Sequence, residues 1–540
     1  MDNHCDKSSV AKADELNHID DVPQNEKPND EITPITSAFA GLTRAQAVRK
    51  FWRLYATGLM VSIGAMYSGY GHSVIGSIIA NEGFIEQFAT VTDPETGAPA
   101  LNSTHVSLWQ AMNFASQIII QLIAPITADR FGRKFNMWAL TVFLALSIVL
   151  AIVAKSWELI LCSRLVGGFA SGLLSSSIMI YLSETALPQF RGALLGAFSL
   201  FFAIGQLFLA IGLKILKDTT PLKFRNIFYS EFVFCGLWLI PMLYLPESPV
   251  WYVMHDRPED AKKALRRLIG NVEGYDFDHE CAVIKYETDK SAELQKSHAD
   301  NQWRAFFTWL NIKRAIIATL PFTFQNFVGA PLFFNYATYF FALAKLDDPF
   351  LGNLVIQLVL VAGIIASFYL VDTAGRRTLV IYGGIAMGVL CFIVGGLGFL
   401  EANTATGAAL VTLCAIWAFI YAISLAPIGW ISLVEVSSPL FRAKSTAFAS
   451  IIQSASGVLF NYTVPLMLSN QNAGWGQKIG LFFGGITVVY LVPTILLFPE
   501  TKGRTYEELD ELFERGVPAW KFATTETAHQ RSVQLRLGQH

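Results

Sequence analysis

The sequence predicts an all-α membrane protein in which twelve transmembrane helices form two pseudo-symmetric six-helix bundles. Three observations lead to this fold class. Of the 540 residues, 53% are hydrophobic and only 15% are charged, whereas a soluble domain usually carries about 25% charged residues. Apolar runs reach the roughly 20 residues that a helix needs to cross a bilayer. Charged motifs of the first half return in the second half, which is typical of a duplicated membrane bundle.

Twelve apolar segments are long enough to be spans. The Gly-rich stretch from Gly167 to Gly172 suits helices that pack backbone to backbone in lipid. We expect the spans at residues 52–78, 106–128, 135–154, 157–183, 193–216, 226–246, 315–343, 349–371, 377–399, 409–434, 446–469 and 478–498.

A short charged motif occurs twice, each time between two spans. Asp129-Arg130-Phe131-Gly132-Arg133-Lys134 returns 243 residues later as Asp372-Thr373-Ala374-Gly375-Arg376-Arg377. Other charged landmarks return at offsets of 251 and 253 residues. The charges that we assign to this repeat are Asp129, Arg133, Glu184, Arg191 and Glu247, and then Asp372, Arg376, Glu435, Arg442 and Glu500.

These charges are expected at the cytoplasmic ends of helices. They are either plain positive-inside anchors or parts of a gate. Their mixed sign and duplication favour a gate, because arginine binds carboxylates in a bidentate manner. We expect pairs that bridge the two halves, close the inner side and break when it opens.

The distribution of Lys and Arg predicts the orientation. The loops 79–105 and 400–408 contain neither residue, whereas the turns that carry the repeat are basic. Both termini and the middle loop are therefore expected in the cytoplasm of a protein of the plasma membrane. The sequon Asn102-Ser103-Thr104 lies in the first outer loop, so we expect a glycan on Asn102.

Five regions follow from these spans. Residues 1–45 are expected to be a disordered cytoplasmic tail. The two bundles occupy 46–249 and 313–500, and a tail follows at 501–540. The linker 250–312 should contain short helices, because Ala261, Ala264, Leu265 and Leu268 follow a proline at helical spacing.

Composition also excludes several functions. The net charge of −2 provides no basic field for nucleic acid. Six cysteines show no CxxC pair, so neither a metal site nor another cofactor is predicted. We find no nucleotide-binding loop or nucleophile motif and do not expect an enzyme. The expected partners are a small molecule and the lipid bilayer, and we expect a monomer.

In its charged and glycine-rich motifs the chain resembles the sugar porter branch of the major facilitator superfamily. The likeness covers about residues 50–520 and includes the duplicated motif, Arg164-Leu165-Val166-Gly167-Gly168, Pro246-Glu247-Ser248-Pro249 and Pro499-Glu500-Thr501-Lys502-Gly503-Arg504. Within the branch it is most similar to fungal maltose and α-glucoside permeases. Tyr336-Ala337-Thr338-Tyr339-Phe340-Phe341 and Gly474-Trp475-Gly476-Gln477-Lys478 carry that closer likeness.

The resemblance implies a sugar pocket between the halves. Carboxamides both donate to and accept from hydroxyls without charge, and an aromatic ring covers the C–H face of a sugar. The last amide of the family's helix 7 motif is replaced here by Pro331, which argues against simple hexose selectivity and is compatible with a larger α-glucoside or a non-sugar polyol. The contacts implied by family position are Gln206, Gln325, Asn326, Trp430 and Asn461.

Energy coupling is left open by one substitution. Proton-coupled relatives carry an Asp in the first span that faces an Arg, but this chain has Gly71 and keeps Arg164. The missing carboxylate favours facilitated diffusion. Glu231 and His72 are the alternative proton carriers, since both are titratable groups expected inside the membrane.

Transport of a sugar is the function that the residues favour, either secondary-active or facilitative. The altered residues at 71, 326 and 331 keep a second function class open, a carrier or exporter of a small non-sugar metabolite. A sugar sensor is a third class, and we expect it least because such proteins usually carry long cytoplasmic tails.

Overall fold

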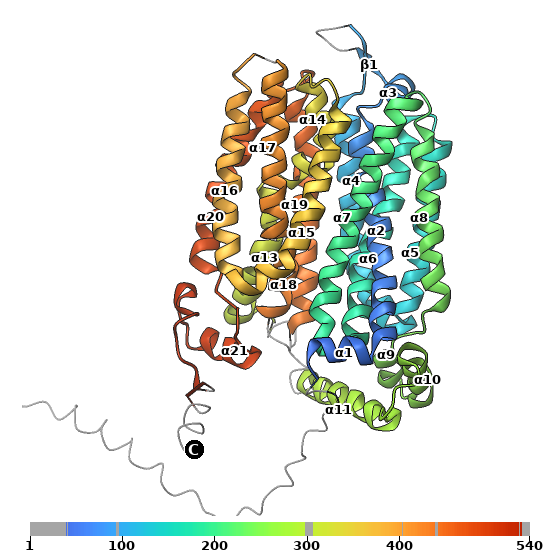
Figure 1. Cartoon of the computed structure of the whole chain (residues 1–540), viewed down its shortest axis with the longest axis vertical. Helices are drawn as coiled ribbons and strands as arrows, with labels where there is room; N and C mark the ends of the chain where they lie inside the picture. Colours follow the sequence, from blue (N-terminus) through green and yellow to red (C-terminus); the bar gives the residue numbers. More distant parts are fainter. Residues whose placement is uncertain are drawn as a thin grey trace, which may run out of the picture.

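The computed structural model describes residue 39 and residues 42–92, 97–296, 306–401, 403–437, 441–528 and 530–531. Nearly all of the predicted N-terminal tail, residues 1–45, lies outside the described residues. Two helical bundles stand side by side, one for each half of the chain (Figure 1). Short helices lie below them, and a small hairpin lies above.

The first bundle follows the predicted order of six spans. Its membrane helices are α2 (Trp52–Ile78), α4 (Ser103–Phe131), α5 (Arg133–Val153), α6 (Trp157–Thr185), α7 (Pro188–Thr219) and α8 (Arg225–Tyr244). The helix α1 (Arg44–Lys50) precedes them. The loop between α2 and α4 contains α3 (Glu82–Phe88) and the antiparallel strands β1 (Val91–Thr92) and β2 (Pro99–Ala100).

The second bundle contains two interrupted spans. The predicted span 315–343 forms α13 (Trp309–Phe327), the π-helix η2 (Pro331–Asn335) and α14 (Ala337–Leu343). The predicted span 409–434 forms α17 (Thr404–Ile423) and α18 (Leu425–Glu435). The other four are α15 (Pro349–Ala374), α16 (Arg376–Leu397), α19 (Arg442–Leu468) and α20 (Ile479–Leu497), with the turn η4 (Gly476–Lys478) before α20.

Residues that break helix geometry account for both interruptions. Gly329 has φ +103°, which favours glycine, and Pro331 has no N–H to continue the hydrogen-bond ladder of α13. In the second case Ser424 leaves the helical region with φ −116° and ψ −82°. Pro427 falls in the first turn of α18, where its missing N–H costs little.

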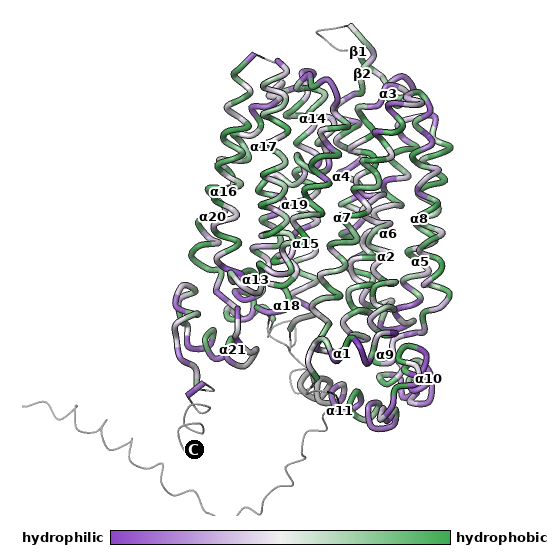
Figure 2. Tube along the Cα trace, viewed as in Figure 1, coloured by the Kyte–Doolittle hydropathy of each residue, from purple (hydrophilic) through white to green (hydrophobic). Residues whose placement is uncertain are grey.

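The twelve-helix prediction is confirmed. Ten helices in the described part of the chain are long and apolar enough to cross a membrane. The helix α2, which contains several Ser, Gly and Tyr residues, and the broken α13–η2–α14 complete the set. Apolar residues cover the bundles, and hydrophilic ones gather in the loops and the lower helices (Figure 2).

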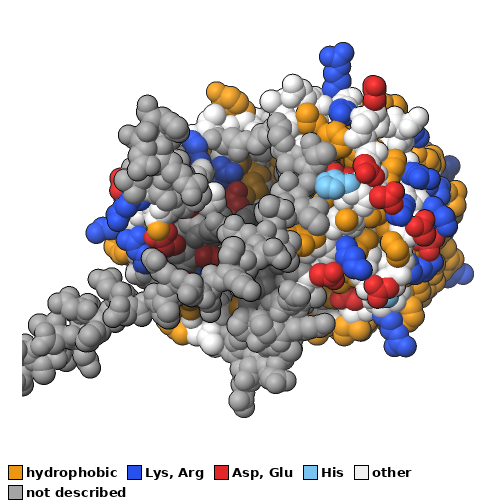
Figure 3. All heavy atoms as spheres, turned by 90° about the horizontal axis from the view of Figure 1, so that it is seen from below, with side chains coloured by type: hydrophobic (Ala, Val, Ile, Leu, Met, Phe, Trp, Pro, Cys, Tyr) orange, Lys and Arg blue, Asp and Glu red, His pale blue; other side chains and the backbone are white. Residues whose placement is uncertain are grey.

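A layer of short helices lies beneath the bundles. It consists of α9 (Pro249–Met254), α10 (Pro258–Ile269) and α11 (Phe277–Lys296) after the first bundle, and α21 (Tyr506–Glu514) with η5 (Ala519–Lys521) after the second. Ala261, Ala264, Leu265 and Leu268 are the buried face of α10, as their spacing predicts. Seen from below, the described surface on this side carries Lys, Arg, Asp and Glu side chains (Figure 3).

Candidate functional site

A cavity of about 250 Å³ lies between the two bundles. Four of the five predicted sugar contacts line it, namely Gln206, Gln325, Asn326 and Trp430. Asn461 is fully buried and is not among the lining residues. The lining residues that we had not singled out for this role include Ser68, His72, Gln117, Gln121, Asn335, Tyr421, Gln453 and Ser454.

The two amides of α13 are held by the protein in fixed orientations. Gln325 Nε2 donates to the Leu425 carbonyl at 3.0 Å, and its Oε1 accepts from the Tyr421 hydroxyl at 3.0 Å. Asn326 Nδ2 donates to the Gln453 carbonyl at 3.0 Å. A carbonyl only accepts, so each amide nitrogen must face its carbonyl partner. The oxygen of Asn326 is therefore the atom left for a ligand.

The remaining amides come from both halves. Gln206 Nε2 donates to Ser73 Oγ at 2.8 Å, which leaves its oxygen for the cavity. Ser454 Oγ of α19 donates to Gln121 Oε1 of α4 at 3.2 Å and joins the two halves. The oxygen Oε1 of Gln453 is buried and has no hydrogen-bond partner among the described residues. Much of the polar wall thus offers hydrogen-bond acceptors.

An aromatic wall faces these amides. Trp430 on α18 packs against Phe322 with ring centroids 4.6 Å apart and meets Phe198 of the other half at 6.3 Å. Phe114, Phe202 and other aromatic rings also line the cavity. Such faces suit the C–H surface of a ligand whose polar groups point to the amides.

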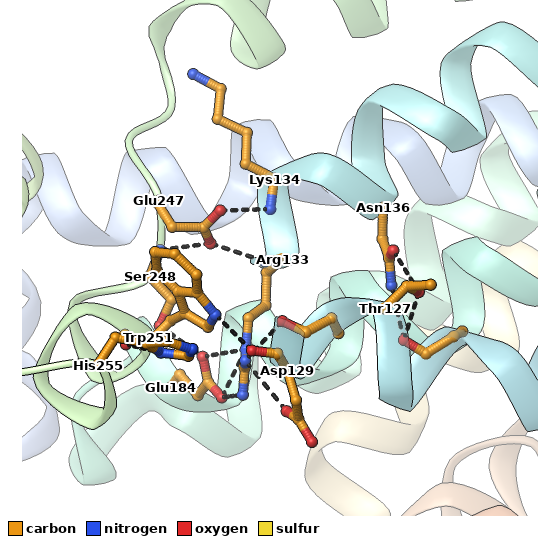
Figure 4. Close-up of polar contacts among 12 residues, drawn as sticks. Thr127, Asp129, Arg133, Lys134, Asn136, Glu184, Glu247, Ser248, Trp251 and His255 are labelled. Atoms are coloured by element: carbon orange, nitrogen blue, oxygen red, sulfur yellow. Dashed lines mark hydrogen bonds and ion pairs between the residues drawn. The ribbon is translucent and has the colours of Figure 1, made fainter. Parts of the chain in front are cut away.

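The repeated charges form a compact network at the end of the first bundle that the sequence predicts to face the cytoplasm, which we call the inner end (Figure 4). Arg133 Nη2 lies 2.7 Å from Glu184 Oε1, and Arg133 also pairs with Asp129 at 3.3 Å. Glu247 accepts from the backbone N–H groups of Arg133 and Lys134 at 2.9 and 3.0 Å. A carboxylate at this place satisfies the free N–H groups at the start of α5 and complements the helix dipole.

The second bundle repeats this network. Arg376 Nη2 lies 3.2 Å from Glu435 Oε1. Glu500 accepts from the backbone N–H groups of Arg376 and Arg377 at 2.9 and 3.1 Å, which caps α16. Thr501 Oγ1 donates to Glu435 as Ser248 Oγ donates to Glu184 in the first bundle.

The structure also explains the repeated glycine of the motif. Gly132 has φ +99° and Gly375 has φ +91°. A Cβ on either would lie 2.3 Å from Glu247 Oε2 or 2.6 Å from Glu500 Oε2. Both the backbone conformation and the approach of the capping carboxylate therefore require glycine.

The inner pairs that the structure describes do not bridge the two halves, and the bridging pairs expected from the sequence stay a prediction. Every inner pair described above joins residues of one half. The side chains of Arg191, Asp372 and Arg442 lie outside the described part, so their partners stay predictions.

At the opposite end, which we call the outer end after the predicted orientation, contacts tie the halves together. The Asp348 carboxylate lies 2.7 Å from Lys214 Nζ and 2.9 Å from Lys217 Nζ, which joins α15 to α7. Burial acts to raise the pKa of Asp348, but hydrogen bonds from the two lysines outweigh it and lower the pKa to about 2. Gln471 accepts from the Ser103 N–H at 3.2 Å and donates to the Leu101 carbonyl at 2.9 Å. We call these two contacts the outer clasps.

A second small void lies inside the first bundle. Gly71, His72, Arg164 and Glu231 line it. Arg164 Nη1 donates to the Gly71 carbonyl at 3.0 Å. A Cβ on Gly71 would lie 2.5 Å from Glu231 Oε1, so the Glu231 carboxyl group occupies the space that a side chain at residue 71 would need. Glu231 is only 3% exposed.

The predicted glycosylation residue is the N-cap of α4. Asn102 Oδ1 accepts from the Thr104 N–H at 2.9 Å. Thr104, the third residue of the sequon, is exposed.

Comparisons with known proteins agree with this architecture. Residues 57–513 match the family model described as "Sugar (and other) transporter". The chain belongs to this family. It is an integral, multi-pass membrane transporter and not an enzyme.

Individual relatives span most of the chain. It is 27% identical over 503 residues to the general alpha-glucoside permease of Saccharomyces cerevisiae, which covers 92% of this chain and 81% of that protein. It is 28% identical over 530 residues to the MFS transporter fmqE of Aspergillus fumigatus. This alignment covers 94% of this chain and 96% of fmqE. The fold matches a partially occluded inward-open structure of the xylose transporter XylE from E. coli with a TM-score of 0.69 and 21% sequence identity. The match covers 84% of this chain and 100% of XylE in that structure.

Proposed function

We propose that the protein moves a neutral sugar across the plasma membrane by alternating access, with both termini in the cytoplasm. The substrate class is an α-glucoside such as maltose, or a hexose. Relatives that include an alpha-glucoside permease support this choice.

The chemistry of the cavity is the observation that carries the proposal. None of the described residues that line it is Lys, Arg, Asp or Glu. A charged ligand would lose its hydration without gaining a counter-charge. Free amide oxygens, such as those of Asn326 and Gln206, require donors, and the hydroxyl groups of a sugar supply them. Trp430 offers an apolar face beside them.

Alternating access follows from where the halves are joined. The outer clasps and the Gln121–Ser454 hydrogen bond connect the bundles, while each inner network keeps its own bundle together. Two internally braced bodies can then rock about the cavity, exposing it first on one side and then on the other.

An uptake panel tests the proposed substrate class. Radiolabelled glucose, maltose, trehalose and sucrose are offered to yeast that lacks its own sugar carriers and expresses this protein. We expect saturable uptake of at least one α-glucoside or hexose, competed by unlabelled sugar. No uptake of any of the four, with the protein present at the cell surface, would reject the proposal.

A neutral non-sugar polyol is the second candidate substrate. The alignment to fmqE over 94% of this chain, at 28% identity, and the replacement of an amide by Pro331 favour keeping it, because the name of fmqE specifies no sugar. Efflux of a labelled non-sugar metabolite, together with failure of the sugar panel, would support it.

For energy coupling, the geometry favours Glu231 over simple uniport. The sequence favours uniport because Gly71 removes a carboxylate. Yet the Glu231 carboxyl group takes the space beside Gly71, lines the same void as Arg164 and makes no hydrogen bond within the described residues. A carboxyl group buried in this way is costly while charged, so it gains a proton readily when the site closes to water. His72 lines both this void and the substrate cavity and is the alternative carrier.

A protonophore separates these mechanisms. Sugar accumulation above the external concentration, lost on adding the protonophore, indicates proton coupling. If Glu231→Gln abolishes accumulation but keeps sugar exchange, Glu231 is the proton carrier. If Glu231→Gln still accumulates sugar and His72→Ala does not, His72 is the proton carrier. If the internal sugar concentration never exceeds the external concentration, the protein is a uniporter.

Glycosylation of Asn102 is proposed as support for the orientation. Because Asn102 caps α4, the variant to use is Thr104→Ala, which removes the sequon and keeps the cap. We expect wild-type protein to shift on a gel after glycosidase treatment and Thr104→Ala to show no shift. An unshifted wild type would remove this support.

A further inference from the structure

The amide missing at residue 331 has a structural counterpart one turn further along the chain. Pro331 begins the π-helix η2, in which the Tyr336 N–H reaches back five residues to the Pro331 carbonyl at 3.1 Å. This wide turn ends at Asn335, whose side chain lines the cavity and is 7% exposed. The π-turn therefore returns a carboxamide to the wall where Pro331 has none.

A chain of hydrogen bonds fixes which way this amide faces. Asn461 Nδ2 donates to the Gly457 carbonyl at 2.8 Å. Because a carbonyl accepts only, the oxygen of Asn461 must face the other way, and it accepts from Asn335 Nδ2 at 2.8 Å. The Tyr336 hydroxyl also donates to the Asn461 carbonyl at 2.9 Å and holds this part of α19 against η2.

The consequence is an unoccupied acceptor on Asn335. Its nitrogen is used by Asn461, and no described residue donates to its Oδ1. A buried acceptor gains most from a ligand that can donate. Asn335 also lies where the halves meet, because its backbone carbonyl packs directly against Gly76 of α2.

We propose that Asn335 is a specificity-determining residue whose Oδ1 accepts a hydrogen bond from a substrate hydroxyl. Asn461 is its positioning residue, acting through the Asn335 amide and not by touching substrate. This inference rests on the proposed function and assigns one sugar hydroxyl to a residue that the family likeness did not indicate.

Transport kinetics of Asn335→Ala test the inference, with labelled maltose as the first probe and another panel sugar if the wild type prefers it. We expect KM to rise about tenfold while the maximal rate per surface molecule stays within about twofold, since a binding contact is lost. Asn353→Ala is the matched control, because Asn353 is also buried, accepts from Gln357 and lies outside the cavity lining. An unchanged KM in Asn335→Ala, or an equal rise in the control, overturns the proposal.

Monodeoxy analogues of the transported sugar sharpen the test. One analogue should compete about tenfold less well than the parent sugar in the wild type and equally well in Asn335→Ala. If every analogue discriminates alike in both proteins, Asn335 contacts no hydroxyl. If the wild type transports no sugar of the panel, the proposed function fails first, and this inference fails with it.

The role of Asn461 is tested by non-additivity. Asn461→Ala should raise KM as Asn335→Ala does, and the double variant should be no worse than Asn335→Ala alone. Effects that add would show that Asn461 is merely structural and would overturn its assignment. If Asn461→Ala does not reach the membrane, the analogue series in Asn335→Ala decides the proposal by itself.

Discussion

The outer and inner ends of this transporter are built on different principles. At the outer end Asp348 and Gln471 join one bundle to the other. At the inner end Arg133 and Arg376 pair with carboxylates of their own bundle. The inner networks therefore stiffen each half, while the outer clasps set how the halves sit relative to each other. In this structure the two halves are in polar contact at the outer end.

Breaking an inner network should have the largest effect. The Arg133 side chain is only 6% exposed and pairs with the partly buried Glu184. Arg133→Ala therefore leaves the Glu184 carboxylate without its arginine. We expect a stability loss of about 3 kcal/mol and near-complete loss of uptake. Thermal unfolding of the purified protein and uptake per surface molecule measure both. The control is Arg130→Ala, an exposed neighbour. Equal melting temperatures in the two variants would show that the network does not stiffen the bundle.

Breaking the Asp348 clasp should shift conformation more than stability. Asp348→Asn removes both lysine pairs and should favour the outward-open state by about tenfold. The readout is labelling from outside, by an impermeant thiol reagent, of Leu360→Cys in the cavity wall on a background without other cysteines. Asp218→Asn is the control, because it pairs with Lys214 within α7. Identical labelling in both variants would contradict the clasp.

Breaking the second clasp should give a smaller shift in the same direction. Gln471→Ala loses neutral hydrogen bonds to Leu101 and Ser103, each worth about 1 kcal/mol or less. We expect labelling of the Leu360→Cys reporter between that of the parent and that of Asp348→Asn. Labelling at or above the level of Asp348→Asn would mean that the polar clasp, and not the ion pairs, dominates closure.

Mild acid should have no effect on the Asp348 clasp. A lowered carboxyl pKa stabilises the paired state above the ordinary value of 3.8, and this stabilisation is lost only as pH falls through about 2. Labelling of the reporter should therefore be equal at external pH 7.5 and pH 4.5. The comparison uses Glu231→Gln, so that protonation of Glu231 does not contribute. Increased labelling at pH 4.5 would show that Asp348 titrates in the wrong range for this account.

The duplicated motif shows what could be predicted from residues alone. Its Gly, Arg and Glu residues return at fixed offsets because each bundle needs the same turn, cap and ion pair. Four of the five residues that the family resemblance implies also line the cavity, since they keep the family's places along its helices. The sequence could not predict whether these charges pair within one bundle or between the two bundles. Bridging and internal pairing use the same residues and differ only in how the two bodies are placed.

Asn335 marks the other limit of prediction. Its amide reaches the cavity because Gly329 takes a left-handed conformation and Pro331 starts a π-turn, which rotates the following side chains away from α-helical positions. Asn461 was expected in the pocket and instead lies one layer behind it. Ordinary helical spacing predicts neither result.

The sequence by itself therefore determined the membrane class, the twelve spans, the duplication and the polar character of the cavity. These depend on composition and on short-range patterns that every helix must satisfy. Only the tertiary structure decided which amide oxygens remain free, which charges pair within a half and which carboxylate stands beside Gly71. Those outcomes depend on distances of a few ångströms between helices that are far apart in the chain, and local preferences do not encode such distances.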